Sequence, residues 1–569
     1  MDKLSTLDFI TVGIIALAFI GIPFLAKNSE KGLFTMSHKL PWIFSAASIF
    51  VIYWNPTMDM VNTRLVVENG YSGLWFLKDI LLTIGIGPVL FVPMWARLNI
   101  TTDNQIIPLR FSGIGATLLQ KFRAIYVGIF VAAILCSFYT LGIYKLVKAF
   151  FPITDTLFFT LFGLTSLLLI LKNSLSIKVK SDLIVSILFL VVIPLGLYFL
   201  IDSLGGWLTM KGELMTNHAD KIALFPTDGG NGESWANVIV FLSIQWWSAR
   251  IQDQSSVNTQ RYFAIKDPWK AFKSIFIPVV VISITFAFSS FIWDAALISH
   301  VQMEEAETSY VLLLTNALPA GIKGALLITF VLGFVTSFEA IMSWGAGMVT
   351  YDLFGNSSFA KKVNINFIGY LSMGLIALSS LLIAIFSSEI YFLITLLLSI
   401  SIGVGPVYIL RWFWWRINAW SQLSAMIASF IFAVSADWLY AHYPLEYIRD
   451  LLLTYDMSWY VLKLLLITPI VSVIWLAVTF LTKHDDINHL KSFVAQSQTS
   501  GIWPFATAPF HWRKKLIAII LIGLAAIMPI WIIWLFKFQS VPIGLLLSFI
   551  WGFILYIAYK LMRSVLMKS

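Results

Sequence analysis

The sequence predicts an all-α protein that crosses a membrane many times. Hydrophobic residues make up 59% of the 569 residues, charged residues only 12%, and the mean hydropathy is +0.86. A soluble domain carries about 25% charged residues, so this chain has too little polar surface to cover a water-exposed globule of its size. The apolar residues also fall into separate runs of about 20 residues, which is the length of a bilayer-spanning helix.

About 15 such runs follow one another along the chain. Some short pairs would merge, so between about 13 and 15 spanning helices are expected. The expected segments are 6–26, 42–66, 72–96, 123–148, 153–171, 181–203, 234–252, 272–299, 324–353, 366–387, 389–410, 418–441, 457–481, 515–536 and 541–562.

The charges between these segments predict the orientation in the bilayer. Basic residues recur in alternate connections, as at Arg97, Arg250 and Arg411, whereas the connections between them are acidic or neutral, as at Glu304 and Asp450. Loops rich in Lys and Arg stay on the cytoplasmic side. We therefore expect a multi-pass protein of the cell membrane with its amino terminus outside and its carboxyl terminus in the cytoplasm.

The same loops account for the net charge of +9. No run of basic residues forms a phosphate-binding patch, so the lipid bilayer, and not nucleic acid, is the expected large partner. The single cysteine, Cys136, allows no internal disulfide and no thiolate zinc site. The seven histidines are scattered along the sequence. With no recognisable metal cluster or nucleophile–base pair, neither an enzyme nor a bound cofactor is expected.

The second segment is interrupted by Asn55-Pro56. Proline removes a backbone donor and clashes with the carbonyl four residues earlier, so the carbonyls from Val51 to Trp54 would lack helical partners. Irregular backbone survives at membrane depth only where protein or a bound ion satisfies it, and such breaks form ion sites in secondary transporters. The alternative is a simple proline kink.

The ninth segment carries Thr336-Ser337 and then Glu339. The two adjacent hydroxyls are candidate ion ligands, although Ser and Thr often bond to their own helix instead. Glu339 lies about 200° around the helix from Ser337, so we expect it to be buried and to meet a polar or basic partner on another helix, or to titrate. Asp182, at the start of the sixth segment, is a ligand candidate or a helix cap.

Several motifs in order resemble the solute:sodium symporter family. They are Trp95, Arg97, Thr102 and Arg110–Gly113, then Gln260-Arg261-Tyr262 with Lys266-Asp267, then Thr336-Ser337 with Trp344-Gly345-Ala346 and Tyr351–Phe354, then Arg411–Ser421, and finally Leu490–Phe493 with Gly501 and Trp503. The chain departs from the family at Tyr53–Pro56, where small or polar residues are usual, and at Glu339.

The resemblance implies a core of two inverted five-helix repeats at about 42–203 and 234–410, with peripheral helices at about 6–26 and 418–562. It also implies a sodium site. By position its ligands would be the carbonyls of Val51 and Trp54 and the side chains of Thr336 and Ser337, with Asp182 near the same ion.

These features predict sodium-coupled symport of a small polar solute such as a sugar or an amino acid. Depth and polarity give five candidate solute contacts, which are Asn55, Asp59, Lys78, Gln245 and Ser399. Two alternatives stay open: a proton-coupled transporter in which Glu339 or Asp182 carries the proton, and a solute sensor that does not transport.

Overall fold

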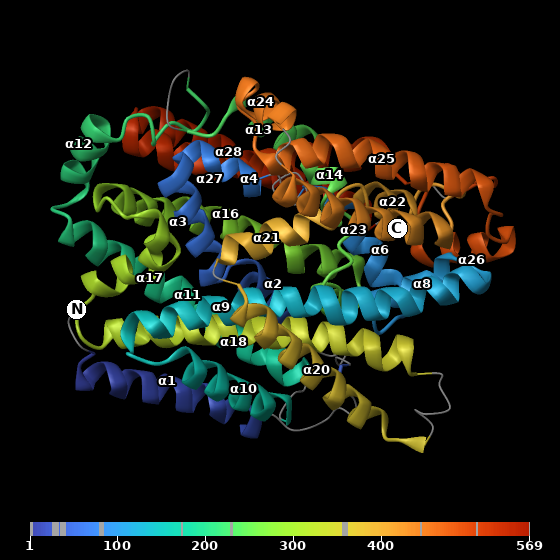
Figure 1. Cartoon of the computed structure of the whole chain (residues 1–569), viewed down its shortest axis with the longest axis horizontal. Helices are drawn as coiled ribbons and strands as arrows, with labels where there is room; N and C mark the ends of the chain where they lie inside the picture. The colour runs from blue at the N-terminus through green and yellow to red at the C-terminus, as the bar shows by residue number, and fades with distance from the viewer. Residues whose placement is uncertain are drawn as a thin grey trace.

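The computed structural model is built from helices (Figure 1). It describes residues 4–25, 33–34, 41–78, 85–171, 175–227, 232–263, 265–355, 362–387, 389–443, 446–507 and 510–567. Within these ranges, extended pairing is limited to one isolated bridge between Trp414 and Ile502. The all-α prediction is therefore confirmed.

Every expected membrane segment contains helix. The long helices are α1 (Thr6–Leu25), α8 (Gly113–Ile125) continuing into α9 (Ala132–Phe150), α10 (Asp155–Leu171), α11 (Leu175–Ser203), α16 (Pro268–Ile298), α18 (Ile322–Met348), α20 (Ile365–Ile385), α23 (Ala419–His442), α25 (Trp459–Leu481), α27 (Trp512–Phe538) and α28 (Val541–Leu566). Among the residues described, nine helices are long and apolar enough to span a membrane without a partner segment.

Two further segments are interrupted within the described ranges: α2 (Trp42–Tyr53) with α3 (Pro56–Asn69), and α21 (Ile390–Ser399) with α22 (Gly405–Leu410). Helix α13 (Trp235–Val240) continues through a π-helical turn, Phe241–Gln245, into α14 (Trp246–Ser248). Helices α4 (Trp75–Lys78) and α6 (Val92–Arg97) lie on either side of residues 79–84, which are outside the described ranges. Short helices lie between the long ones: α7 (Ile106–Arg110), α12 (Trp207–Asn217), α15 (Thr259–Phe263), α17 (Ala306–Ala317), α24 (Glu446–Thr454) and α26 (Ile487–Ser497).

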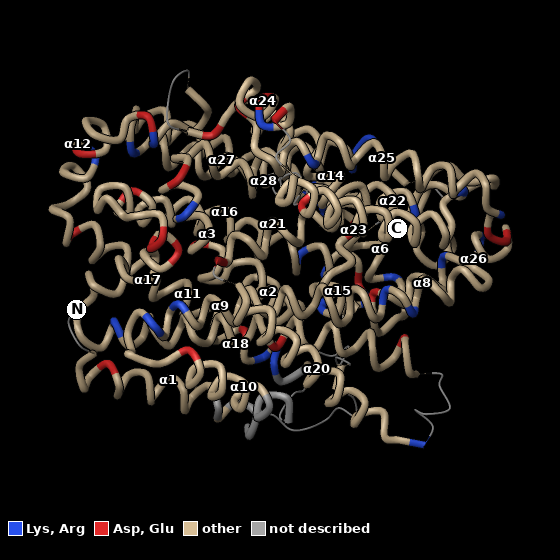
Figure 2. The backbone as a smooth tube through the Cα atoms, in the orientation of Figure 1, with Lys and Arg blue, Asp and Glu red and all other residues tan. Residues whose placement is uncertain are grey.

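Most long helices run along the longest axis of the molecule (Figure 1). One end, here called the α12 end, holds α12 and α17; the other, the α26 end, holds α26 and part of α8. Figure 2 shows acidic residues around α12 and α17, and lysines and arginines around α8 and α26. Acidic residues also lie beside α26 and basic residues beside α12, so each end carries charges of both signs.

The interrupted helix α2 lies in the middle of the bundle. It packs against α11, α16 and α18, and its residues from Ser45 to Ile52 are buried. Small side chains at Ser45, Ala46, Ala47 and Ser48 allow the neighbouring helices to approach closely. The break that follows α2 is therefore enclosed by protein, as non-helical backbone at membrane depth must be.

Candidate functional site

The second membrane segment breaks where the sequence predicts. Helix α2 ends at Tyr53, and α3 begins at Pro56. The two residues between them, Trp54 and Asn55, adopt extended backbone angles. The Asn55 side chain accepts a hydrogen bond from the Thr57 amide at 3.1 Å and donates one to the Ile52 carbonyl at 3.2 Å. Asn55 thus caps both half-helices, and the predicted break is confirmed.

Helix α18 faces this break through Ser337. The Ser337 hydroxyl donates to the Val51 carbonyl at 3.5 Å, and Ser337 is fully buried. Thr336 is also buried, but its hydroxyl bonds back to the Leu332 carbonyl at 2.9 Å. A Cβ on Gly333 would come within 3.3 Å of the Pro56 ring, so this glycine allows α18 to lie directly against the start of α3.

Asp182 of α11 approaches the same region from the other side. Its Oδ2 accepts a hydrogen bond from Ser48 at 2.5 Å, and the Ser48 hydroxyl in turn accepts one from the Arg261 guanidinium at 3.1 Å. The second carboxylate oxygen, Oδ1, is buried and finds no hydrogen-bond donor among the described residues. Asp182 is therefore a buried carboxylate with one oxygen available to a cation, and it lies too far along α11 to cap it.

Glu339 meets a basic partner on another helix, as predicted. Its carboxylate lies 3.6 Å from the Lys178 ammonium of α11. The Lys178 side chain is 3% exposed, whereas that of Glu339 is 17% exposed. The partner is thus confirmed, while Glu339 is only partly buried because it lies at the edge of the contact between α18 and α11.

A cavity of about 460 Å³ lies beside the break. It is lined by Trp54, Asn55 and Asp59 of the broken segment, by Lys78 of α4, and by residues 249–251, 254 and 256–258 after α14. Its walls are mainly apolar and aromatic. The aromatic residues are Tyr53, Trp54, Tyr71, Trp75, Phe138, Tyr139, Phe286, Trp344 and Trp531.

Asp59 and Lys78 supply charge to this cavity in different ways. Four donors surround the Asp59 carboxylate, namely Trp54 at 3.1 Å, Asn62 at 3.3 Å, and Ser289 and Tyr310 at 3.2 Å each. Asp59 therefore ties the start of α3 to α16 and α17. The Lys78 ammonium lies 3.4 Å from the centre of the Phe286 ring, held over an aromatic face.

Two of the five expected solute contacts lie outside the lining of this cavity. Gln245 is fully buried and donates to the Phe76 carbonyl at 2.7 Å. Ser399 accepts a hydrogen bond from Lys463 at 2.9 Å. The Gln245 amide nitrogen and the Ser399 hydroxyl thus have partners within the protein, while the Gln245 Oε1 is buried and has no hydrogen-bond partner among the described residues.

Other lining residues had no signal in the sequence. Tyr139 of α9 lies against the side chains of Ser337 and Asn55 and so connects the cavity with the helix break. Gln254 accepts a hydrogen bond from the Tyr53 hydroxyl at 3.2 Å. Helix α27, expected to be peripheral, contributes Ile527, Ile530 and Trp531 to the wall.

At the α26 end, buried ion pairs join separate segments of the chain. Arg411 pairs with Asp253 at 2.6 Å, and Arg123 pairs with Asp103 at 2.5 Å. Trp344, which lines the cavity, donates to Asp103 at 2.9 Å. The cavity wall at Trp344 is therefore hydrogen-bonded to the ion pair of Asp103 and Arg123.

No family model and no curated protein matches the chain. Its structure is similar to that of a Na+-coupled sialic acid symporter in a substrate-bound outward-open state, with a TM-score of 0.62 and 16% identity over 85% of this chain and 99% of that chain. A nucleobase-cation-symport-1 family transporter in a closed conformation matches with a TM-score of 0.42 and 14% identity over 81% of this chain and 99% of that chain. The first likeness establishes that the chain has the five-plus-five inverted-repeat transporter fold.

Proposed function

We propose that this chain is a sodium-coupled symporter that carries a small solute across the cell membrane by alternating access. The observation that carries the proposal is the approach of Ser337 on α18 to the Val51 carbonyl at the break after α2. Hydroxyl and carbonyl oxygens are hard ligands of the kind that sodium prefers, and broken helices supply them in secondary transporters.

The proposed sodium site takes its ligands from three elements. The carbonyls of Val51 and Trp54 would come from the break, and the hydroxyls of Thr336 and Ser337 from α18. The free Oδ1 of Asp182 would supply negative charge nearby. Thr336 must exchange its bond to the Leu332 carbonyl for the ion, which a change of one side-chain rotamer accomplishes.

The cavity beside the break favours a solute with an apolar or ring-shaped face and at least one polar group. Its volume of about 460 Å³ lies within the range of small-molecule sites. Asn55, Asp59 and Lys78 supply the polar contacts, and the aromatic walls supply the rest. Tyr139 and Asn55 touch both regions, so solute and ion each bias the same half-helix.

The proton-coupled alternative centres on Lys178, Glu339 and Asp182. Because Lys178 already neutralises Glu339 at 3.6 Å, Glu339 has a structural role without carrying a proton. This pair favours sodium as the coupling ion. A sensor that binds the same solute without moving it would share the site, and flux measurements separate it from a transporter.

Sodium binding can be tested without knowing the solute. Purified protein is heated in NaCl and in KCl at equal ionic strength, for wild type, Ser337→Ala and Thr329→Ala. Thr329 is the matched control, because it is a buried hydroxyl of α18 that bonds its own helix at 2.6 Å. An ion present at 100 times its Kd stabilises the folded state by about 2.7 kcal/mol.

Wild type and Thr329→Ala are expected to unfold at higher temperature in NaCl than in KCl, and Ser337→Ala is expected to lose that difference. Equal stability of the wild type in both salts would contradict the proposed ion. Sodium-driven accumulation of solutes in proteoliposomes then identifies the substrate, with sugars, amino acids, nucleobases and aromatic carboxylates as the first panel.

A further inference from the structure

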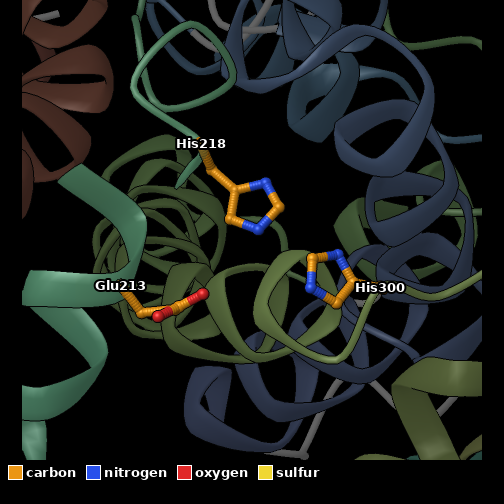
Figure 3. Close-up of side chains that lie close together, drawn as sticks. All are labelled: Glu213, His218 and His300. Atoms are coloured by element: carbon orange, nitrogen blue, oxygen red, sulfur yellow. The ribbon is translucent and has the colours of Figure 1, made fainter. Parts of the chain in front are cut away.

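Three side chains with metal-binding groups meet at the α12 end, away from the cavity and the helix break. They are Glu213 of α12, His218 directly after α12, and His300 directly after α16, and one potential ligand atom of each lies within 4.8 Å of the others. Figure 3 shows the carboxylate and the two imidazole rings facing a common space. The histidines are distant in sequence, which is why the scattered pattern gave no sign of a cluster.

Local geometry brings the two rings together. Helix α12 ends at Asn217, and the His218 backbone leaves helical angles, so its ring folds back over the side on which Glu213 lies. His300 has a φ of 48°, the left-handed conformation that favours glycine or asparagine after a helix.

The ring atoms are in a suitable state for a metal. The Nε2 atom of His218 is buried and has no hydrogen-bond partner among the described residues. Burial, followed by the nearby His300 ring, lowers the pKa of His218. His300 is exposed and leaves a path for an ion from solution.

We propose that Glu213, His218 and His300 bind one divalent transition-metal ion of the zinc class, and that this metal restrains the segment 218–224, which runs from the cluster to the cavity wall at Leu224. Two imidazoles and one carboxylate suit zinc better than Ca²⁺ or Mg²⁺, which prefer oxygen ligands. Zinc ligand atoms lie about 2.0–2.2 Å from the ion, so the three side chains close in slightly around it.

The restraint follows from the bonds that the segment makes. The His218 carbonyl accepts from the amides of Lys221 and Ile222, and the Lys221 carbonyl accepts from the Tyr71 amide at 2.8 Å. The Lys221 ammonium also bonds the Glu68 carbonyl at the end of α3, at 2.5 Å. Three residues further on, Leu224 lines the cavity. A metal joining His218 to His300 would thus fix this segment, together with the end of α3, to the end of α16.

The metal site is tested on the whole purified chain in nanodiscs after removal of metals with a chelator. Calorimetric titration with ZnCl2 is expected to give one saturable site in the wild type. His300→Ala removes an exposed ring and is expected to weaken binding at least tenfold, whereas His300→Cys keeps a ligand and retains binding. His442→Ala is the matched control, since this histidine is also exposed but bonds the Trp438 carbonyl outside the cluster. Equal zinc affinity of wild type and His300→Ala would overturn the site.

Hydrogen exchange measures the restraint without a transport assay. ZnCl2 is expected to slow exchange at the amides of Tyr71, Lys221 and Ile222 in the wild type and not in His300→Ala, while MgCl2 has no effect in either. Zinc binding with unchanged exchange at these amides would overturn the restraint. Because neither readout requires sodium or solute, failure here is distinct from failure of the proposed symport.

Discussion

The two ends of the molecule hold their helices together in different ways. At the α26 end, the ion pairs Arg411–Asp253 and Arg123–Asp103 consist of side chains that are at most 1% exposed. At the α12 end, Arg64 pairs with Glu389 at 2.8 Å, and these side chains are 13% and 45% exposed. The two pairs named at the α26 end are therefore excluded from water, whereas the α12 end combines the exposed pair of Arg64 and Glu389 with the buried pair of Lys537 and Asp294.

This difference indicates which contacts between helices are easier to separate. Breaking a buried ion pair leaves an uncompensated charge in a dry environment, whereas an exposed pair exchanges its partner for water at little cost. The exposed contact between Arg64 and Glu389 is therefore easier to separate than the buried pairs of Arg411 with Asp253 and Arg123 with Asp103.

The largest effect is expected from Asp253→Ala. The Asp253 carboxylate accepts bonds from Arg411 at 2.6 Å and from the Trp412 indole at 2.7 Å. Its loss leaves a fully buried guanidinium without its counter-charge and is expected to cost about 3–5 kcal/mol of stability. Thermal unfolding in detergent measures the loss. A variant as stable as the wild type would mean that the α26 end is not held by this pair.

The next prediction concerns opening of the α26 end. Asp103→Asn removes the charge that holds Arg123 and weakens the bond from Trp344 in the cavity wall. A reporter Ser256→Cys in the cavity is then expected to react several times faster with a membrane-impermeant maleimide applied from the α26 side. The native Cys136 is fully buried and gives little background. Unchanged labelling would contradict a role of this ion pair in closing the α26 end.

Glu339→Gln tests the ion pair of Glu339 with Lys178, and its effect on stability is expected to be intermediate. The buried Lys178 ammonium loses its counter-charge at 3.6 Å, so stability is expected to fall by about 1–3 kcal/mol. The difference in unfolding temperature between NaCl and KCl is expected to remain. If the variant instead abolishes the pH dependence of uptake while stability is unchanged, Glu339 is a proton carrier.

The smallest effect is expected from Glu389→Ala at the α12 end. Because Glu389 is 45% exposed, loss of its pair with Arg64 is expected to cost less than about 1 kcal/mol. Unfolding of this variant beside Asp253→Ala gives the comparison directly. A loss as large as that of Asp253→Ala would show that exposure does not distinguish the two pairs.

The fold was predictable because its signals are local. Apolar runs of the right length, alternating loop charges and one Asn55-Pro56 interruption are each contained in a short stretch of sequence. The helix break and a basic partner for Glu339 were predicted in this way, because proline chemistry and helix periodicity depend on neighbouring residues. The approach of Ser337 to the break was instead implied by the family resemblance.

The solute contacts were harder to predict because they depend on which neighbour each polar group meets. Gln245 and Ser399 lie outside the lining of the cavity, and the Gln245 amide nitrogen and the Ser399 hydroxyl bond the Phe76 carbonyl and Lys463. Conversely, Trp531 lines the cavity from a helix that the family resemblance places outside the core. Contacts between segments hundreds of residues apart leave no trace in composition or spacing.

The contribution of α27 to the cavity wall has a consequence for biosynthesis. The first lining residue, Ile52, leaves the ribosome long before the last, Trp531. At about 5–20 residues per second, the interval between them is roughly half a minute to a minute and a half. Throughout that time the inserted helices lack the part of the cavity wall that α27 supplies. The cavity is therefore complete only after α27 has been synthesised and has packed against the earlier helices.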